Sequence, residues 1–376
     1  MANVFTAIQP QLYSAAQEVS SEPFAIVKAI NTFFDDKMVA VGDTVKVPVA
    51  PKATTADFTA AMTPTAGTDA TASAVSVAIS ASKKVSWNLT GEQVQSLKNA
   101  GNDNEWVRQM VVQGMRALRN EMEVAAYRAV RAGASRAIGT AGTTPFASDL
   151  SAITGARKIL QDNGAPLADL QMVVDTNANL NLLNLGIVQQ AYQAGNDSER
   201  RSGLLGRQFG FQIDASAGIS AVTKGTGASY VTSGSTAPGV TDIALVTGTG
   251  TVLAGDVVTF AADSTNKYVV GTGVAAPGTL SLNRPGARVT IATANALTVG
   301  NTAVANLAFE RSAVVGVVRP PMIPANPYIQ QTVISDSQGM SYLLLEIAGY
   351  GMTTWELHVA YGFQAVQPEH ICQILG

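Results

Sequence analysis

The sequence is poor in the residues that support catalysis, metal binding and membrane insertion. Cys372 is its one cysteine, which excludes an intrachain disulfide and a cysteine-rich zinc site. Apolar runs are short, and none approaches the roughly eighteen residues that a membrane-spanning helix needs. The opening residues lack a basic segment followed by an apolar one, so secretion is not expected. A reducing, cytoplasmic site of folding fits these absences.

Charge is also scarce. Only 14% of the 376 residues are charged, whereas 47% are hydrophobic and the mean hydropathy is +0.17. A soluble monomer usually carries nearer a quarter of charged residues, so part of this surface is expected to meet other protein. The net charge of −3 argues against a dedicated nucleic-acid-binding surface. The length allows more than one domain.

Motifs for catalysis are missing as well. His358 and His370 stand on or beside predicted strands, and neither belongs to a cluster with metal-ligand spacing. The glycine-rich strings lack the Gly-Lys-Ser/Thr ending of a phosphate loop, and there is no Gly-x-Ser-x-Gly or HExxH motif. We therefore expect no enzyme, no metal and no cofactor. Cys372, in an apolar strand, is expected to be a small buried hydrophobe.

One long helix is the strongest positive signal. The sequence from 102 to 133 predicts a helix of about 45 Å that Asn102 or Asp103 caps and that Gly133 ends in a left-handed conformation. Apolar residues recur along it at spacings of three and four: Val107, Val111, Met115, Leu118, Met122, Ala125 and Ala129.

The polar face of this helix is rich in arginine. It carries Arg108, Arg116, Arg119, Arg128 and Arg131, with Glu121 and Glu123. By default such a face is solvated and forms pairs three or four residues apart. The alternative is a rigid strut whose charged side meets neighbouring copies of the chain.

Before the helix, residues 1–42 predict an arm with one or two short helices, held by aromatic contacts rather than folded alone. Alternating residues predict strands at 44–49, 75–79 and 85–89. The Thr/Ala-rich stretch between the first two has too few large side chains to build a core. We therefore expect an extended β-loop that is either disordered or ordered on a neighbour, with Lys83 and Lys84 at its base.

After the helix, the pattern changes twice. A helix at 149–163, a strand at 170–175, a helix at 179–191 and a strand at 210–214 predict a small α+β unit. Residues 221–306 have no Trp, Met, Cys, His or Glu and hold several short strands, which predicts an inserted β-barrel or sandwich. Closing strands follow at 314–318, 342–347, 355–361 and 371–375.

This order of parts resembles that of the major capsid proteins of tailed double-stranded-DNA bacteriophages, and in particular of those that carry an inserted β domain. The resemblance rests on the opening MANVFTAIQPQLYSAAQEV, the extended loop before the long helix, MVVDTNANLNLLNLG with ERRSGLLGRQFGFQID, the re-entry LAFERSAVVGVVRPP and the ending GMTTWELHVAYGFQAVQPEHICQILG. The resemblance covers nearly the whole chain, and its specificity comes from the order of the parts rather than from a single motif.

The resemblance implies an α+β capsid fold with the following parts. They are an N-terminal arm (1–43), an extended β-loop (44–90), a peripheral domain (91–164) with spine helix 103–132, an axial domain (165–220), an inserted β domain (221–306) and the axial and peripheral remainder (307–376). No long charged helical segment precedes the arm, so a separate scaffolding protein is expected rather than a fused one.

The implied function is a structural subunit that forms pentamers and hexamers of an icosahedral shell around phage DNA. Expected partners are further copies, a scaffolding protein, a portal protein, decoration proteins and non-specifically bound DNA, but no membrane. The chain would be located in the virion after assembly in the host cytoplasm. The alternative is a phage decoration or adhesion protein whose β insert binds a surface ligand. Predicted inter-subunit residues are Asp57, Phe58, Lys83, Lys84, Arg108, Arg116, Arg119, Glu121, Glu123, Glu199, Arg200 and Arg201.

Overall fold

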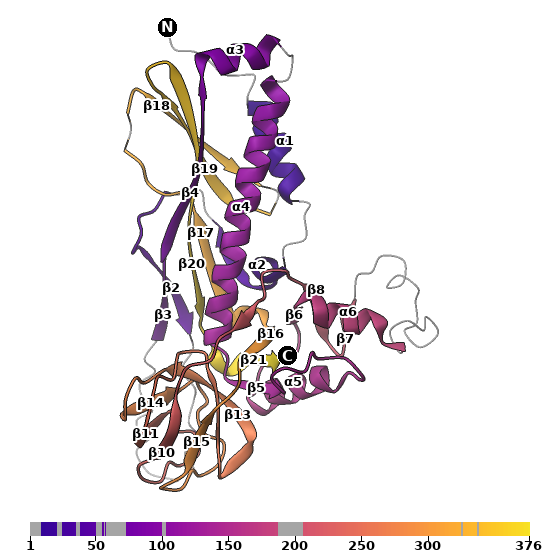
Figure 1. Cartoon of the computed structure of the whole chain (residues 1–376), viewed down its shortest axis with the longest axis vertical. Helices are drawn as coiled ribbons and strands as arrows, with labels where there is room; N and C mark the ends of the chain where they lie inside the picture. Colours follow the sequence, from indigo (N-terminus) through magenta and orange to yellow (C-terminus); the bar gives the residue numbers. More distant parts are fainter. Residues whose placement is uncertain are drawn as a thin grey trace, which may run out of the picture.

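The computed structural model shows an elongated molecule whose long axis follows helix α4 (Asp103–Ala132), with the short helix α3 (Gly91–Asn99) at one end and a strand-rich unit at the other (Figure 1). The structure describes residues 9–20, 25–34, 38–49, 55, 57, 73–99, 103–186, 206–324, 326–336 and 338–376. Helix α3 lies between the predicted strand at 85–89 and the long helix.

Helix α4 buries the predicted apolar face. Val111, Met115, Leu118 and Met122 are 0–3% exposed. Beyond Met122 the buried positions are Ala126, Tyr127 and Val130, and the predicted Ala125 and Ala129 are only partly buried. Besides the arm helices, α4 contacts the strands β20 (Met352–Ala365), β16 (Ala303–Glu310) and β13 (Asp263–Thr272).

The predicted role of Gly133 is wrong. Its φ is not in the left-handed region, which thirteen other glycines of the described chain occupy. Glycine is needed there for space, because a Cβ at Gly133 would lie 2.1 Å from the Cβ of Ala365. Close packing of the helix end against strand β20, rather than a special turn, therefore selects this residue.

A six-stranded sheet packs along α4. Its strands are β1 (Asn31–Phe34), β17 (Val314–Arg319), β20 (Met352–Ala365), β19 (Ser341–Ala348) and β18 (Ile329–Ser335), with β4 (Ala81–Thr90) also paired to β20. The 14-residue β20 pairs with β19 along its first half, with β17 along its second half and with β4 on the other side. The predicted strands at 314–318, 342–347 and 355–361 are confirmed.

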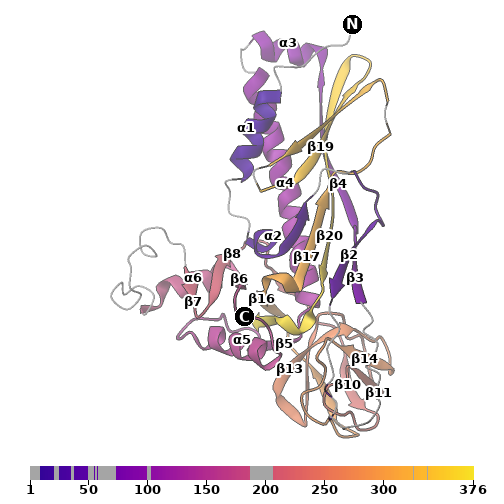
Figure 2. The same cartoon turned by 180° about the vertical axis from the view of Figure 1, so that it is seen from behind.

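The arm contributes helices α1 (Gln9–Ser20) and α2 (Ala25–Ala29) as well as β1. Both helices contact α4, and Figures 1 and 2 show α1 alongside it. The buried arm residues are aliphatic: Ala15, Ala16, Val19, Ala25, Ile26, Val27, Ala29 and Ile30. Among the aromatic side chains of the arm, only that of Phe33 is described, and it is 42% exposed, so the expected aromatic contacts otherwise lie outside the described residues.

Strands β2 (Thr44–Val49) and β3 (Ser73–Ala78) form the predicted hairpin, in register from Thr44 opposite Ala78 to Val49 opposite Ser73. Valines on one face of the hairpin pack against a small core cluster that includes Val315 and Val317 of β17. Of the loop between the two strands, only Thr55 and Asp57 are described, and both are exposed.

A mixed sheet with helices α5 (Ser151–Asp162) and α6 (Thr176–Asn184) forms a second core. Its strands are β5 (Arg136–Gly139), β21 (Ile371–Leu375), β16 (Ala303–Glu310), β6 (Leu170–Val174), β8 (Phe211–Ala215) and β7 (Arg207–Gln208), with the short 3-10 helices η1 (Arg311–Ala313) and η2 (Pro368–His370) nearby. Cys372 is buried here, as predicted. Helix α6 begins earlier than predicted because Asp175 caps it by accepting from the N–H groups of Asn177 and Ala178.

Residues 228–299 form a closed barrel in which every strand pairs with two others. Around the barrel the order is β12 (Val257–Phe260), β15 (Ala296–Val299), β10 (Ala228–Thr232), β11 (Asp242–Thr249), β14 (Thr279–Leu282), β13 (Asp263–Thr272) and again β12. Its core cluster, which includes Tyr230, Phe260 and Tyr268, draws on residues 230–299 alone. The chain enters and leaves through the paired strands β9 (Ala221–Val222) and β16. That the barrel is a domain inserted into a capsid fold stays a prediction.

Candidate functional site

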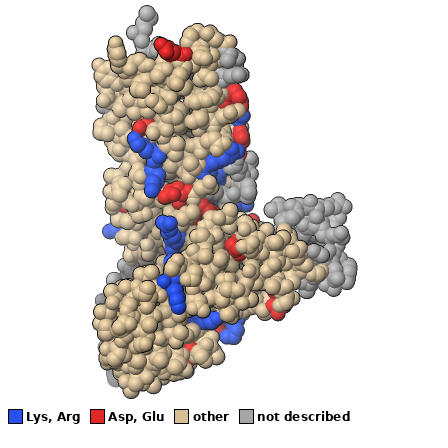
Figure 3. Space-filling model, in the orientation of Figure 1, with Lys and Arg blue, Asp and Glu red and all other residues tan. Residues whose placement is uncertain are grey.

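Exposed charges are sparser on the barrel, where they include Asp242, Arg284 and Arg288, than on the body of the molecule. Figure 3 shows Lys and Arg as a band down the middle of one face, above and beside an almost uncharged lower unit. Of the barrel's few charged residues, Asp256 and Asp263 are 5% exposed, and Lys267 donates to the carbonyl of Gly139 in the body. The candidate functional surfaces are therefore the arm–helix contact, the hairpin base and the barrel junction.

The arm binds along one side of α4. Arg108 and Arg116 pair with Glu18 of α1, and the Arg119 guanidinium donates to the carbonyl of Val19 and to Gln338. One turn further, the Glu123 carboxylate accepts hydrogen bonds from the N–H groups of α2 (Ala25–Ala29).

The order of these charges fits the polarity of the arm helices. Arg108, Arg116 and Arg119 contact the last turn of α1, whose carbonyl groups lack helical partners. Glu123 contacts the first turn of α2, whose N–H groups lack helical partners. Cations are favourable at a helix C-terminus and anions at an N-terminus. The charged face of α4 thus recognises the arm of its own chain, in the direction in which the arm runs.

Arg108 also pairs with Glu105 at 2.7 Å, within α4. Hydrogen bonds from Arg108 and Gln109 lower the pKa of Glu105 to about 2, so this carboxylate is ionised at neutral pH. The same contacts, Glu105 first and then Glu18, raise the pKa of Arg108.

At the base of the hairpin, Lys83 pairs with Glu121 of α4 at 3.2 Å and Lys84 pairs with Glu356 of β20 at 2.7 Å. Both lysines are about half exposed. Burial acts to raise the pKa of Glu356, but hydrogen bonds from Lys84 and His358 outweigh it and lower that pKa. These pairs hold strand β4 against α4 and β20 at the surface of the molecule.

The predicted inter-subunit residues thus fall into three groups. Arg119 and Glu123 are 3% and 5% exposed and bind the arm within the chain, and an inter-subunit role for them stays a prediction. Five residues lie at or near the surface and form intrachain pairs: Lys83, Lys84, Arg108, Arg116 and Glu121. Asp57 is exposed, and Phe58, Glu199, Arg200 and Arg201 lie outside the described residues. An inter-subunit role stays a prediction for the surface residues.

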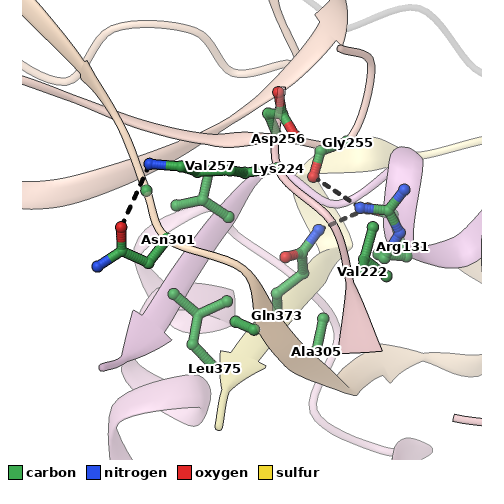
Figure 4. Close-up of a pocket in the computed structure, with 12 residues that line it drawn as sticks. Arg131, Val222, Lys224, Gly255, Asp256, Val257, Asn301, Ala305, Gln373 and Leu375 are labelled. Atoms are coloured by element: carbon green, nitrogen blue, oxygen red, sulfur yellow. Dashed lines mark hydrogen bonds between the residues drawn. The ribbon is translucent and has the colours of Figure 1, made fainter. Parts of the chain in front are cut away.

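The barrel joins the body at the end of α4 (Figure 4). The Arg131 guanidinium donates to the carbonyl of Gly255 at 3.1 Å, and Gln373 donates to the Arg131 carbonyl at 2.7 Å. Asn283 of the barrel donates to the carbonyls of Ala132 and Ala134, each at 2.7 Å, so it satisfies the carbonyls that the end of the helix exposes.

A cavity of about 30 Å³ lies at this junction, lined by Arg131, Lys224 and Asp256 among others. Burial lowers the pKa of Arg131. Its Nε is buried without a hydrogen-bond partner in the described chain. The volume suits about two water molecules, which would satisfy this nitrogen. Together with the β13–β5 pairing and the β9–β16 stem, these contacts fix the barrel to the spine helix.

The described residues show no catalytic constellation. No group of three or more His, Cys, Asp and Glu side chains among them is placed to hold a metal ion. His358 pairs with Glu356 at 2.9 Å, and burial raises the pKa of the Cys372 thiol to about 12, so the thiol stays protonated. Among the helices of the described ranges, none combines the length and apolar character that crossing a membrane requires.

The fold is similar to that of phage capsid chains. A chain of the capsid of cyanophage P-SCSP1u aligns with a TM-score of 0.51 and 12% identity, over 94% of this chain and 88% of that one. Other similar structures are Mycobacterium phage Che8 (TM-score 0.47, 14% identity, 89% and 84% covered) and a virus-like particle from Pyrococcus furiosus (TM-score 0.46, 8% identity, 97% and 98% covered). No protein-family model and no curated protein matches the sequence. The chain therefore has a phage capsid fold, as predicted.

Proposed function

We propose that this chain is a structural, non-enzymatic subunit that assembles with further copies of itself into a phage capsid shell. The similarity to the cyanophage P-SCSP1u capsid chain, which extends over most of both chains, carries this proposal. The low content of charge supports it, because surfaces that become buried between subunits are depleted in charged residues.

The finer assignments follow from the resemblance. We infer that the shell is icosahedral, is built from pentamers and hexamers and encloses double-stranded DNA. A scaffolding protein and a portal protein are the expected partners in assembly, which takes place in the host cytoplasm. In this assignment α4 is the spine, the hairpin β2–β3 begins the extended loop that overlaps a neighbour, and the barrel is an accessory domain.

The test is to express the chain and to examine it by size-exclusion chromatography and negative-stain microscopy. Closed shells or hollow particles are expected. Small discrete oligomers, with and without co-expressed scaffolding protein, would contradict the proposal and favour a decoration or adhesion protein. Normal shells without any scaffolding protein would refute the need for that partner alone.

A second test addresses the predicted interface residues outside the described ranges. Charge reversal at Arg200 and Arg201 should lower the yield of shells more than it lowers the thermal stability of the unassembled subunit. The matched control is charge reversal at Lys158, an exposed residue that pairs with Asp162 within α5. Equal shell yields for both variants would count against an interface role.

A further inference from the structure

Glu123 is a buried carboxylate that binds two separate parts of the chain. It is 5% exposed, and its Oε1 accepts from the N–H of Ile26 at 2.8 Å while its Oε2 accepts from the N–H of Val27 at 3.2 Å. Its Oε1 also accepts from the hydroxyl of Ser216 at 2.8 Å. These three donors, from described residues, are all uncharged, so the position of this buried charge depends on hydrogen bonds.

The two parts that meet at Glu123 belong to different cores. Ile26 and Ile30 pack the arm into the main core, which is shared with α4. Ser216 follows strand β8, and its N–H donates to the carbonyl of Val174 at the end of β6, so it moves with the strands of the second core. Glu123, from α4, therefore joins the arm, the spine helix and the β6–β8 strands at one point.

Elsewhere along this border, α2 contacts β6, and the exposed Arg311 guanidinium donates to the carbonyl of Lys28 at 3.3 Å. A groove of about 410 Å³ lies there, lined by Lys28 of α2, Arg311 of η1 and polar residues of the β6–β8 region. Across it, Asp169 lies 3.7 Å from Arg207 and 3.9 Å from Arg311, outside hydrogen-bond range, and all three side chains are at least 40% exposed. Such exposed pairs contribute little, which leaves the buried contact at Glu123 as the strong polar link.

We propose that Glu123 is a positioning residue that couples the placement of the N-terminal arm to the position of the β6–β8 strands. Oε1 is shared by Ile26 and Ser216, so the carboxylate is oriented toward the arm only while Ser216 holds it. The hydroxyl of Ser216 is itself oriented, because it accepts from the N–H of Gly218 at 3.1 Å and therefore donates toward Glu123.

The backbone around Ser216 is shaped to fit the glutamate. A Cβ at Gly218 would lie 3.0 Å from the Cγ of Glu123, so the loop after β8 packs against the stem of the side chain. A displacement of β8 would thus move both the Ser216 hydroxyl, which donates to the carboxylate, and the backbone at Gly218, which packs against the stem of the side chain. Loss of the hydrogen bonds at Ile26 and Val27 is the expected consequence. The arm is thereby linked to strands that lie far from it in the sequence.

Hydrogen–deuterium exchange of the full, unassembled chain tests this coupling, with the peptide that spans residues 25–30 as the readout. In Glu123→Gln, exchange there should be about tenfold faster, because the amide offers one acceptor oxygen and turns a donor toward the α2 N–H groups. In Ser216→Ala, which removes no atom that touches the arm, it should be at least about threefold faster. In the double variant the Ser216→Ala effect should disappear, since its route runs through Glu123.

The control is Ser220→Ala, an exposed serine four residues further along the same loop, which should leave exchange at 25–30 unchanged. Peptides from the β19–β20 ladder report whether each variant is still folded. Exchange unaffected by Ser216→Ala but raised by Glu123→Gln would reduce Glu123 to a local cap and overturn the coupling. Exchange unaffected by either substitution would overturn the anchor itself. Neither outcome depends on whether the chain forms shells.

Discussion

Two glycines of the spine helix should respond to the same substitution in opposite directions. Gly114 lies in the middle of α4 and Gly133 just after its end. A Cβ at Gly114 would meet Trp87 at 3.5 Å and Leu357 and Val85 at 3.7 Å, all ordinary van der Waals distances. A Cβ at Gly133 would lie 2.1 Å from the Cβ of Ala365, far inside the 3.5–4.0 Å at which carbon atoms pack.

The sizes of the two effects follow from these distances. Gly114→Ala gains about 0.5–1 kcal/mol from helix propensity and up to about 0.8 kcal/mol from burying a methyl group. We therefore expect stabilisation of about 1–2 kcal/mol. Gly133→Ala has to move the end of β20 by more than an ångström, and overpacking of this kind costs about 1–3 kcal/mol.

Thermal unfolding of the unassembled chain, followed by circular dichroism, measures both variants. For a chain of this length, 1 kcal/mol corresponds to roughly 1 °C in Tm. The midpoint should rise by about 1–2 °C for Gly114→Ala and fall by about 1–3 °C for Gly133→Ala. A lower midpoint for Gly114→Ala would show that the spine needs a flexible residue at its centre, and an unchanged Gly133→Ala would refute the packing argument at the helix end.

Three further predictions concern single side chains. Burial raises the pKa of Asp336, so its contribution to stability is fully present below the unfolded pKa and is lost as pH rises through the raised folded value. Asp336→Asn keeps the acceptor oxygen for the N–H groups of Gln338 and Met340, and it should flatten the dependence of Tm on pH above about pH 4. An unchanged pH profile of Tm would contradict this. Lys84→Ala should lower the free energy of unfolding by less than about 1 kcal/mol in chemical denaturation, because the Lys84 side chain is 54% exposed, and a clearly larger cost would contradict this. Met122→Ala should cost about 2–5 kcal/mol in chemical denaturation, since that side chain is fully buried, and a cost below 1 kcal/mol would refute its place in the core.

Periodicity predicted most of the regular structure. Residues 355–361 alternate between apolar and polar side chains, whereas 314–318 and 342–347 are short apolar runs whose successive residues are buried. Strand β1 was missed because it has four residues, and its pairing is with β17, almost three hundred residues away. Strand β18 was missed because its sequence, IQQTVIS, follows four prolines and shows no clear alternation of burial.

The site was harder to predict than the fold. A helical pattern distinguishes apolar from polar positions, but it does not distinguish a polar residue in water from one beneath another segment. Arg119 and Glu123 belong to the second kind, because α1 and α2 cover them. The sequence did hold a signal, since Glu18 is one of two carboxylates in the first 34 residues and stands before a run of small and aliphatic residues that can lie on α4.

The use of charge within the chain constrains how its copies can meet. The described arginines near the middle of α4 bind the arm, and Lys83 and Lys84 bind carboxylates of their own subunit. These pairs lie within one subunit, and only 14% of the residues of the chain are charged. Contacts between copies, in the proposed shell, therefore rest mainly on apolar and hydroxyl-bearing surface, such as that of the barrel. Such contacts are less weakened by salt than ion pairs are, because screening acts on charges. Particles that dissociate readily in high salt would contradict this expectation and indicate that ion pairs carry the contacts between subunits.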